Sequence, residues 1–480
     1  NGAMRIPVEL EVWHFGWPLL AATGAGIVMS WFHQRERSVF SVPDLVLIVC
    51  SLAVAAYFLV VYNTSMRMST GTSFAPVGIS FAAIAGTALI MELTRRVAGM
   101  ALVIIGLVFL AYVFAGPYLP GFLGYPGLSV QRFFSQVYTD AGILGPTTAV
   151  SSTYIILFII FAAFLQSSKV GDYFVNFAFA AAGRSRGGPA KVSIFASGLM
   201  GMINGTSAGN VVSTGSLTIP LMKKVGYSKQ SAGAVEAAAS TGGQIMPPIM
   251  GAGAFIMAEI TGIPYTEIAI AAIIPAILYF ASVYFMVDFE AAKTGMRGMR
   301  EDELPKLRTM MKQCYLFVPI IILIVALFMG YSVIRAGTLA TVSAAVVSWL
   351  SPNKMGLRHI LQALEIASYM AIQIIVVCAA AGVIVGVISL TGVGARFSVL
   401  LLDVAATSQA AYAVAASVVA PGLVQLGIEP LTAHFFVFYF AVVSAITPPV
   451  ALASYAAAGI SGANAMETSV ASFRIGIAAF

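Results

Sequence analysis

The stretch from Ala190 to Gly262 is apolar enough to lie in a lipid bilayer, yet two short runs within it cannot form ordinary membrane helix. The first run, NGTSAGN at Asn204–Asn210, crowds small polar side chains between glycines, and the second, TGGQIMPP at Thr241–Pro248, ends in two prolines that remove two backbone donors. Unpaired backbone is tolerated within hydrocarbon only where it lines a cavity enclosed by protein. The two runs therefore predict broken helices that bind ions and a small polar substrate, as in a transporter.

Composition places the whole chain in the membrane. Of its 480 residues 59% are hydrophobic and only 9% are charged, too few charges to cover the surface of a soluble protein. A helix needs roughly 20 apolar residues to cross a bilayer, so the chain has room for about a dozen crossings. The net charge of +6 comes from residues in short loops that form no continuous basic face, so no nucleic-acid partner is expected. We expect an all-α polytopic membrane protein whose partner is the lipid bilayer.

Apolar runs and charged loops divide the chain into five predicted segments. They are N-terminal membrane spans at 1–80, scaffold spans at 81–166, a first repeat of a transport domain at 167–288 with a re-entrant hairpin at 190–225, a cytoplasmic loop with further scaffold spans at 289–359, and a second inverted repeat at 360–480. Within them, Ala75–Leu93 and Val97–Tyr118 are expected to be two spans joined across Arg95 and Arg96.

The distribution of basic residues supports a hairpin that returns to its own side of the membrane. If it does, most of the 25 lysines and arginines fall on one side, as the positive-inside rule requires of the cytoplasmic side. If the hairpin were a full crossing, Lys223, Lys224 and Lys229 would move outside and every later loop would invert. The first hairpin is therefore expected to enter the membrane from the cytoplasm.

An internal repeat relates the two halves of the chain. Pro220, Gly226, Pro247 and Pro248 recur as Pro421, Gly427, Pro448 and Pro449, each 201 residues later, in similar patterns of small apolar residues. With the predicted topology this is an inverted repeat, the arrangement of transporters whose site lies at the middle of the membrane. Further upstream KVGDYF matches GVGARF at an offset of 223, so the second repeat lacks about 22 residues near 408–411. Either the protein carries a further segment there, which we favour, or it lacks half a hairpin.

Three long motifs carry a resemblance to a known family. They are NGTSAGNVVSTGSLTIPLMKKVGY, AGAVEAAASTGGQIMPPIMGAGAF, and FVFYFAVVSAITPPVALASYAAAGI. These motifs resemble the fused membrane subunit of tripartite ATP-independent periplasmic (TRAP) transporters, specifically the TAXI-type branch. The resemblance extends from about Phe81 to Phe480, and the opening spans look like the small membrane subunit fused ahead of the large one.

The resemblance implies a secondary transporter of the bacterial inner membrane. It implies two re-entrant hairpins and two interrupted helices that bind coupling ions, usually sodium, and an organic anion delivered by a soluble periplasmic binding protein. It also implies an elevator-type motion of the transport domain in a monomeric membrane unit. The sequence departs from the family pattern in two places, because the tip of the second hairpin and a first N-terminal span are expected in the family and are missing here.

Two groups of residues are the candidate ion ligands, because small hard cations prefer oxygen donors. The first group joins the hairpin tip to the facing break, namely Asn204, Gly205, Thr206, Ser207, Thr241, Gly242, Gly243 and Gln244. The second, by symmetry, is Ala445, Ile446 and Thr447, just before Pro448. The candidate substrate ligands are Thr206, Ser207 and Thr447. The alternative for such small residues is that they only let helices approach closely.

Glu236 lies in an apolar helix two turns before the first break and is a possible proton carrier, with a hydrogen-bonded structural role as the alternative. Protons therefore remain a second option for the coupling ion. No other metal and no cofactor is expected, and no phosphate-cradling GxxxxGK[ST] motif supports direct use of ATP. We expect ion-coupled uptake of a small carboxylate, such as a dicarboxylate, a keto acid or an acidic amino acid, and no enzymatic activity. The alternative is a membrane channel or scaffold subunit without coupled transport.

Overall fold

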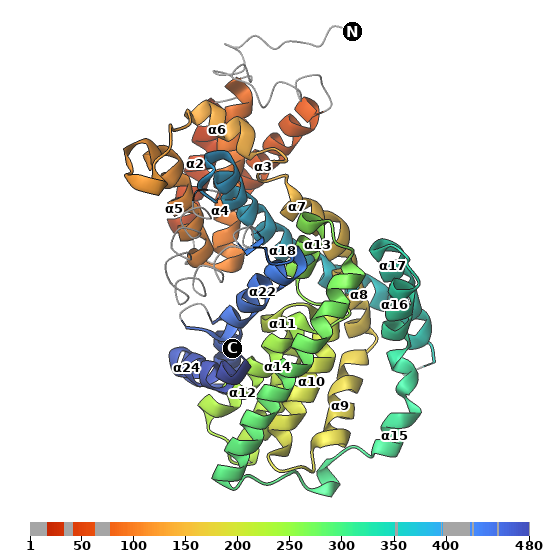
Figure 1. Ribbon diagram of the computed structural model, residues 1–480. Coiled ribbons are helices and arrows are strands. Elements are labelled where there is room, and N and C mark those ends of the chain that lie inside the picture. Colours follow the sequence, from red (N-terminus) through yellow and green to blue (C-terminus); the bar gives the residue numbers. More distant parts are fainter. Residues whose placement is uncertain are drawn as a thin grey trace. The chain divides into compact units, whose positions relative to one another are not determined.

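The structure, a computed structural model, describes residues 17–32, 42–62, 77–350, 354–394, 396, 423–424, 427–448 and 451–479. Every regular element within these ranges is a helix, which confirms the all-α class. The chain forms two compact units (Figure 1). Unit 1 contains residues 1–152 and 372–415, and unit 2 contains residues 153–371 and 416–480.

Unit 1 is built around α4, which packs against α2, α3, α5 and α6. Its elements are α2 (Trp17–Phe32), α3 (Val42–Tyr62), α4 (Val77–Ala98), α5 (Met100–Ala115), η4 (Gly116–Tyr118), η5 (Gly121–Leu123), α6 (Val130–Val137), α7 (Pro146–Val150) and the end of α18 (Leu357–Thr391). The side of α4 that faces these neighbours carries small buried residues such as Ala82, Ala83 and Ala85, which let the helices approach closely.

The turn between the two spans of unit 1 is not where the charges predict it. Helix α4 continues through Arg95 and Arg96, and the chain turns at Gly99, whose φ of +85° suits glycine. The two arginines stay helical because both bond to Glu92 on the same helix, with Arg95 Nη2 at 2.7 Å and Arg96 Nε at 2.8 Å from its Oε1. Arg96 also pairs with Asp44 of α3 at 2.7 Å.

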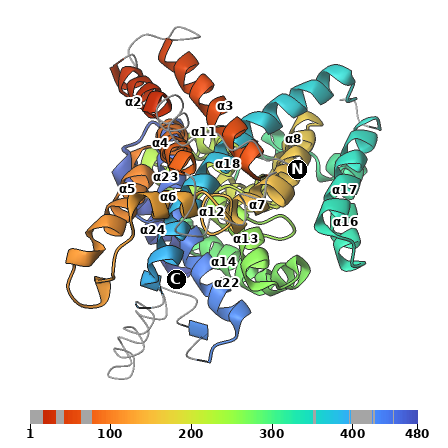
Figure 2. The same cartoon turned by 90° about the horizontal axis from the view of Figure 1, so that it is seen from above.

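Unit 2 surrounds α12, which packs against α10, α11, α14, α22, α23 and α24. In the view from above, α12 is labelled near the centre, close to α13, α14 and α24 of the same unit (Figure 2). Its elements are η6 (Ser151–Ile155, a π-helical turn that begins in unit 1), α8 (Ile156–Ser167), α9 (Val170–Ala182), α10 (Gly188–Asn204), α11 (Ser207–Lys224), α12 (Lys229–Gly242), η7 (Gly243–Ile245), α13 (Ala252–Thr261), α14 (Tyr265–Thr294), η8 (Glu301–Glu303), α15 (Leu307–Lys312), η9 (Cys314–Phe317), α16 (Val318–Phe328), α17 (Val333–Ser348), the start of α18, α22 (Pro430–Val443), η10 (Ser444–Ile446), α23 (Leu452–Ser461), α24 (Ala465–Gly476) and η11 (Ile477–Ala479).

The internal repeat is visible in the backbone at the offset of 201 residues. Both bounds of α22 and of η10 follow those of α12 and η7 at this offset. The match extends to unusual backbone, because Met250 and Ala451 are both non-glycine residues with positive φ, +57° and +30°. Upstream, Lys169 and Gly392 share a left-handed conformation at the offset of 223, with φ of +63° and +66°. The residues near 408–411 lie outside the described ranges, so the shortfall there stays a prediction, as do the predicted segment boundaries.

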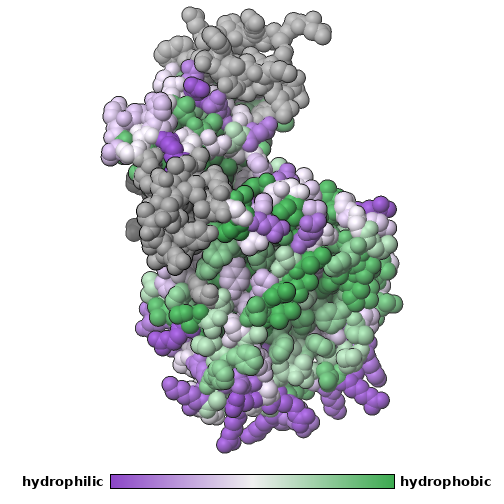
Figure 3. All heavy atoms as spheres, viewed as in Figure 1, coloured by the Kyte–Doolittle hydropathy of each residue, from purple (hydrophilic) through white to green (hydrophobic). Residues whose placement is uncertain are grey.

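Five described helices are long and apolar enough to cross a membrane: Val42–Val60, Gly78–Val97, Pro146–Ser167, Tyr265–Thr294 and Leu357–Thr391. Several shorter apolar helices accompany them. On unit 2, hydrophobic residues cover a broad area of one face, while hydrophilic residues gather at the end where α14 leads into α15 (Figure 3). A surface of this kind needs the bilayer as its solvent, which fits a multi-pass membrane protein.

Candidate functional site

The hairpin of α10 and α11 turns within two residues. Helix α10 ends at Asn204, Gly205 takes a left-handed φ of +58°, and Thr206 is extended before α11 begins at Ser207. Glycine is required at 205 for a second reason, because a Cβ there would lie 2.8 Å from the carbonyl oxygen of Met250. The tip of the hairpin therefore packs directly against the chain that follows the first break.

The first break lies where both prolines predict it. Helix α12 ends at Gly242, a 3-10 turn follows, and Met246 is extended before Pro247. The carbonyls near the prolines nevertheless have donors. The Tyr265 hydroxyl donates to the carbonyls of Pro248 and Ile249 at 2.8 and 2.5 Å, and Gly251 N–H donates to the carbonyl of Gln244 at 2.7 Å. Each of these three carbonyls therefore accepts a hydrogen bond and keeps one lone pair as a possible ligand.

The tip and the break meet through glycine. A Cβ on Gly201 would lie 2.2 Å from the Cα of Gly243, so the backbones of α10 and η7 touch. Beside this crossing, Gln244 Nε2 donates to Ser207 Oγ at 3.2 Å. The structure thus brings together the two halves of the first predicted ion site, which are 37 residues apart at this hydrogen bond.

The remaining side chains of the first site are held by hydrogen bonds. Asn204 Oδ1 accepts from Gln166 Nε2 at 3.0 Å, and its Nδ2 donates to Ser213 Oγ at 3.1 Å. The Thr241 hydroxyl donates to the carbonyl of Ala237 at 2.8 Å, which leaves its lone pairs as possible ligands. Thr206 lies half-buried at the tip.

Asn210, one turn into α11, carries a buried oxygen that lacks a hydrogen-bond donor among the described residues. The side chain is only 1% exposed. Its Nδ2 donates to the carbonyls of Ser197 and Ser240 at 2.8 and 3.3 Å, which fixes the orientation of the amide. A buried acceptor without a donor costs free energy unless a ligand or water satisfies it, and a cation would do so. Asn210 stands in the first polar run but was not assigned to the site from sequence.

Glu236 is fully buried in α12 and has no basic partner among the residues that the structure describes. Hydroxyl groups satisfy its two carboxylate oxygens instead, and they belong to Ser193, Ser197, Thr214, Thr218 and Ser240. The distances are 2.7 Å for Ser193, 2.9 Å for Ser240 and 3.1 Å for Ser197. Because these donors come from α10, α11 and α12, the carboxylate ties the hairpin to the helix that ends in the break. We call Glu236 and these five residues the hydroxyl cluster.

The sequence held a signal for the hydroxyl cluster that was missed. Ser193 and Ser197, Thr214 and Thr218, and Glu236 and Ser240 are each four residues apart, so each pair lies on one face of its helix. Three such pairs in consecutive helices indicate a shared polar interior. Glu236 also packs tightly against Gly215 of α11. A Cβ at position 215 would lie 2.9 Å from Glu236 Cγ, so a larger residue there would crowd the carboxylate.

The second break repeats the geometry of the first. Ala445 and Ile446 are buried in η10, which packs against α12, α23 and α24. Thr447 is extended, and its hydroxyl donates to the carbonyl of Val443 at 3.0 Å. The predicted hairpin partners of this break, before Pro421, lie outside the described residues.

The hydroxyl of Ser454 on α23 is buried and, like the Asn210 oxygen, has no hydrogen-bond partner among the described residues. Helix α23 packs on both α11 and α12.

Ser207 also completes the run GTSAG, which fits the GxSxG pattern of hydrolase nucleophiles. That elbow requires a sharp turn from a strand into a helix. Here the run joins the end of α10 to the start of α11, so helices flank it on both sides. The pattern therefore carries no hydrolase assignment.

Comparison with known proteins identifies the family. A family model described as "Tripartite ATP-independent periplasmic transporter, DctM component" matches residues 85–410 and 407–475. The chain belongs to this DctM family. It is accordingly a multi-pass protein of the inner membrane and a component of a transporter. The two matched stretches meet at 407–410, where the internal repeat places its shortfall.

Individual relatives of this DctM-family chain are distant or match in part. The C4-dicarboxylate TRAP transporter large permease protein DctM of Rhodobacter capsulatus is 23% identical over 408 residues, 77% of this chain and 92% of the relative. The protein with the same description in Vibrio cholerae is 37% identical over 91 residues, 19% of this chain and 20% of the relative. The uncharacterized protein y4mL of Sinorhizobium fredii is 25% identical over 138 residues, 29% of this chain and 32% of the relative. The matches thus span only a fifth and a third of the last two relatives.

Proposed function

We propose that this protein is a secondary transporter that couples uptake of a small organic anion to an ion gradient, sodium in the first instance. The observation that carries this proposal is the junction of hairpin tip and break, where a buried amide oxygen of Asn210 has no donor among the described residues. Ser207 and Gln244 add oxygen atoms at the same junction. Oxygen donors without a fixed positive charge suit a small hard cation.

The substrate proposed is a carboxylate. Two relatives are described as C4-dicarboxylate transporters, and a keto acid or an acidic amino acid has the same carboxylate chemistry. We assign the substrate to Thr206, Ser207 and Thr447. The hydroxyls of Thr206 and Ser207 can donate to a carboxylate beside the bound ion, and that of Thr447 can do so once it leaves the carbonyl of Val443. A soluble periplasmic protein would deliver the substrate to this component of a tripartite system.

We further propose that the protein works as a monomeric membrane unit of the TAXI type, with small and large membrane subunits fused. Alternating access would be of the elevator type, in which the transport domain moves as one body. Its first and second repeats would then carry the two breaks across the membrane together. The shared backbone geometry of η7 and η10 supports this, since both breaks pack on α12 in one unit. Ala445, Ile446 and Thr447 would supply the second ion site.

Uptake into proteoliposomes tests the proposal. The purified protein, its periplasmic binding protein and radiolabelled succinate, 2-oxoglutarate or glutamate are combined under an inward sodium gradient, a proton gradient or neither. We expect uptake of at least one carboxylate that requires the binding protein and collapses when sodium is replaced by choline. Uptake driven by the proton gradient alone would instead assign coupling to protons.

The second candidate function is a channel or scaffold without coupling. A channel needs a continuous polar path, whereas the ligands proposed here belong to the two breaks and the hairpin tip that meets the first of them. In the same assay a channel would equilibrate substrate without the binding protein and without accumulation against a gradient. Accumulation above the external concentration would contradict it.

A further inference from the structure

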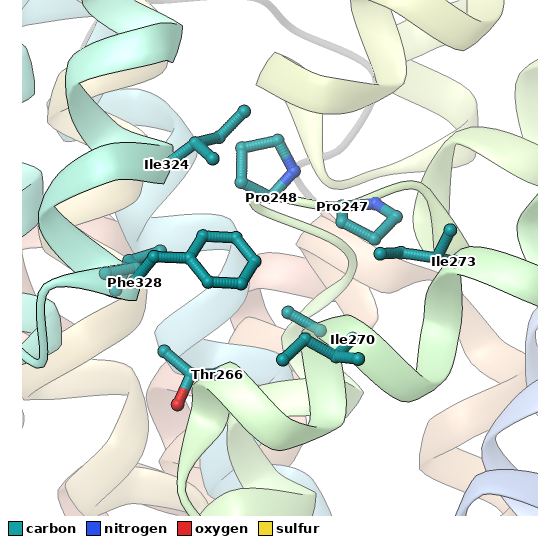
Figure 4. Close-up of a pocket in the computed structure, with 9 residues that line it drawn as sticks. Pro247, Pro248, Thr266, Ile270, Ile273, Ile324 and Phe328 are labelled. Atoms are coloured by element: carbon teal, nitrogen blue, oxygen red, sulfur yellow. The ribbon is translucent and has the colours of Figure 1, made fainter.

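An apolar groove lies beside the two prolines of the first break, and none of its lining residues belongs to the candidate ion site or to the hydroxyl cluster. Its cavity measures about 130 Å³ and is lined by Pro247, Pro248, Thr266, Ala269, Ile270, Ile273, Ile324, Leu327 and Phe328. Figure 4 shows the rings of Pro247 and Pro248 on one side of the space, with Ile324 and Phe328 of α16 on the other. Ile270 of α14 lies beneath, and Ile273 of α14 lies beside Pro247. We call this the proline groove.

The chemistry of the proline groove excludes a polar occupant. Thr266 has the single polar side chain in the lining. The carbonyl of Pro248, which the break would otherwise expose, already accepts from the Tyr265 hydroxyl at 2.8 Å. A buried water needs two to four polar partners, whereas apolar cavities of about 150 Å³ stay dry and bind hydrocarbon such as benzene. The groove therefore favours hydrocarbon over water.

The walls of the groove continue into the lipid-facing surface of unit 2. Ile270 and Ile273 are 48% and 41% exposed, and Phe328 is 66% exposed. Along the same face of α14, Ile274 and Ile277 are 69% and 59% exposed, and in a helix long and apolar enough to cross a membrane such a surface suits contact with bilayer lipid. The hydrocarbon that reaches the groove is therefore that of the membrane itself.

We propose that the proline groove holds one acyl chain of a membrane lipid, which packs against Pro247 and Pro248 between α14 and α16. The acyl chain covers the two proline rings, whereas Gln244 of the same break bonds to Ser207 of the hairpin tip. Filling the cavity also recovers the dispersion contacts that an empty groove would lose. This site is independent of which ion or substrate the protein transports.

Photolabelling with lipid tests the proposal. The protein is reconstituted in vesicles of phosphatidylethanolamine and phosphatidylglycerol that contain a phospholipid with a diazirine within one acyl chain, irradiated, and mapped by peptide mass spectrometry. We expect adducts on the groove residues Ile324, Leu327 and Pro247, in addition to adducts on the exposed Ile274 and Ile277. Adducts on Ile274 and Ile277 without adducts in the groove would overturn the proposal, because another segment or protein would then cover it.

Two variants sharpen the result. Ala269→Trp fills the groove and should abolish the groove adducts while those on Ile274 and Ile277 remain. If the Ala269→Trp protein does not elute as a folded peak in gel filtration, Ala269→Phe is used instead. Thr266→Val keeps the volume, removes the hydroxyl and should leave all adducts unchanged. Loss of groove adducts in Thr266→Val, or their persistence in both Ala269 variants, would contradict an acyl chain in the cavity. Because labelling needs no transport, the outcome does not depend on the proposed function.

Discussion

At the scale of single residues, Glu236 shows how a carboxylate can stay in an apolar unit without a cation beside it. An isolated buried charge is very costly, but one that accepts several hydrogen bonds is largely satisfied. The five hydroxyls of the hydroxyl cluster supply this solvation. The arrangement favours the structural role for Glu236, and the role of proton carrier stays a proposal. The Glu236→Gln variant distinguishes the two roles.

Glu236→Gln replaces one acceptor oxygen by an NH₂ group that faces hydroxyl donors. We expect the free energy of unfolding to fall by about 1–3 kcal/mol, because at least one hydroxyl loses its partner. The measurement is thermal unfolding in detergent, with Glu259→Gln at an exposed position of α13 as the control that should not change. An unchanged melting temperature, together with uptake that no longer depends on pH, would identify Glu236 as a proton carrier instead.

Asn210 is the residue whose removal should separate ion binding from packing. Sodium that binds the folded protein raises its melting temperature, and Asn210→Ala should weaken sodium binding about tenfold or more, equivalent to roughly 1.4 kcal/mol. The shift between sodium and choline buffers is compared in the variant and in Ser472→Ala, which removes a buried hydroxyl of α24 outside the site. A sodium-dependent shift as large in Asn210→Ala as in the unmodified protein would remove this residue from the ion site, whereas a smaller shift would leave the second ion site as its source.

At the scale of elements, two glycines of α10 differ only in what they face. A Cβ at Gly201 would collide with Gly243 at 2.2 Å, whereas a Cβ at Gly198 would meet Phe280 at 3.5 Å, an ordinary contact. We expect Gly201→Ala to destabilise the protein by about 1–3 kcal/mol through overpacking. Gly198→Ala should be neutral or stabilising by up to about 1 kcal/mol, because alanine favours the helix. Equal melting temperatures for the two variants would show that α10 and η7 do not touch.

The sequence predicted the elements best where backbone chemistry is local. Pro247 and Pro248 located the first break and, through the repeat, Pro448 located the second, because proline removes the donor that a helix needs. The end of α4 was misplaced, since Arg95 and Arg96 looked like a loop but are held in the helix by Glu92.

Side-chain networks were harder to predict than breaks. The hydroxyl cluster was missed because its donors converge only when three helices pack together. The buried Oδ1 of Asn210, which has no donor among the described residues, was missed for a related reason. Its position depends on the carbonyls of Ser197 and Ser240, which hold the Nδ2 of the same amide. The spacing of residues along a single helix does not predict which side chains of three different helices will meet.

At the scale of the whole molecule, the two ends of the hairpin lie at one end of unit 2. A Cβ at Gly187, just before α10, would lie 2.8 Å from the hydroxyl of Tyr227, just after α11. Lys191 near the start of the hairpin pairs with Asp288 of α14 at 2.6 Å, and Lys223 near its end donates to the carbonyl of Ser461 at 3.0 Å. The hairpin is thus anchored at its base and carries its polar tip into the unit.

This geometry makes the topology testable by comparing intact cells, which expose the periplasmic side to reagent, with inverted membrane vesicles, which expose the cytoplasmic side. After Cys50, Cys314 and Cys378 are replaced by serine, single cysteines at Arg186 and Ser228 should be labelled by a membrane-impermeant maleimide from the cytoplasmic side alone, because a re-entrant hairpin returns both ends to one surface. Glu259→Cys, near the end of α13 and beyond the first break, is the opposite control and should be labelled from the periplasm. Labelling of Arg186→Cys and Ser228→Cys from opposite sides would make the hairpin a full crossing. It would also place Lys223, Lys224 and Lys229 outside, against the positive-inside rule, and would end the case for inverted repeats.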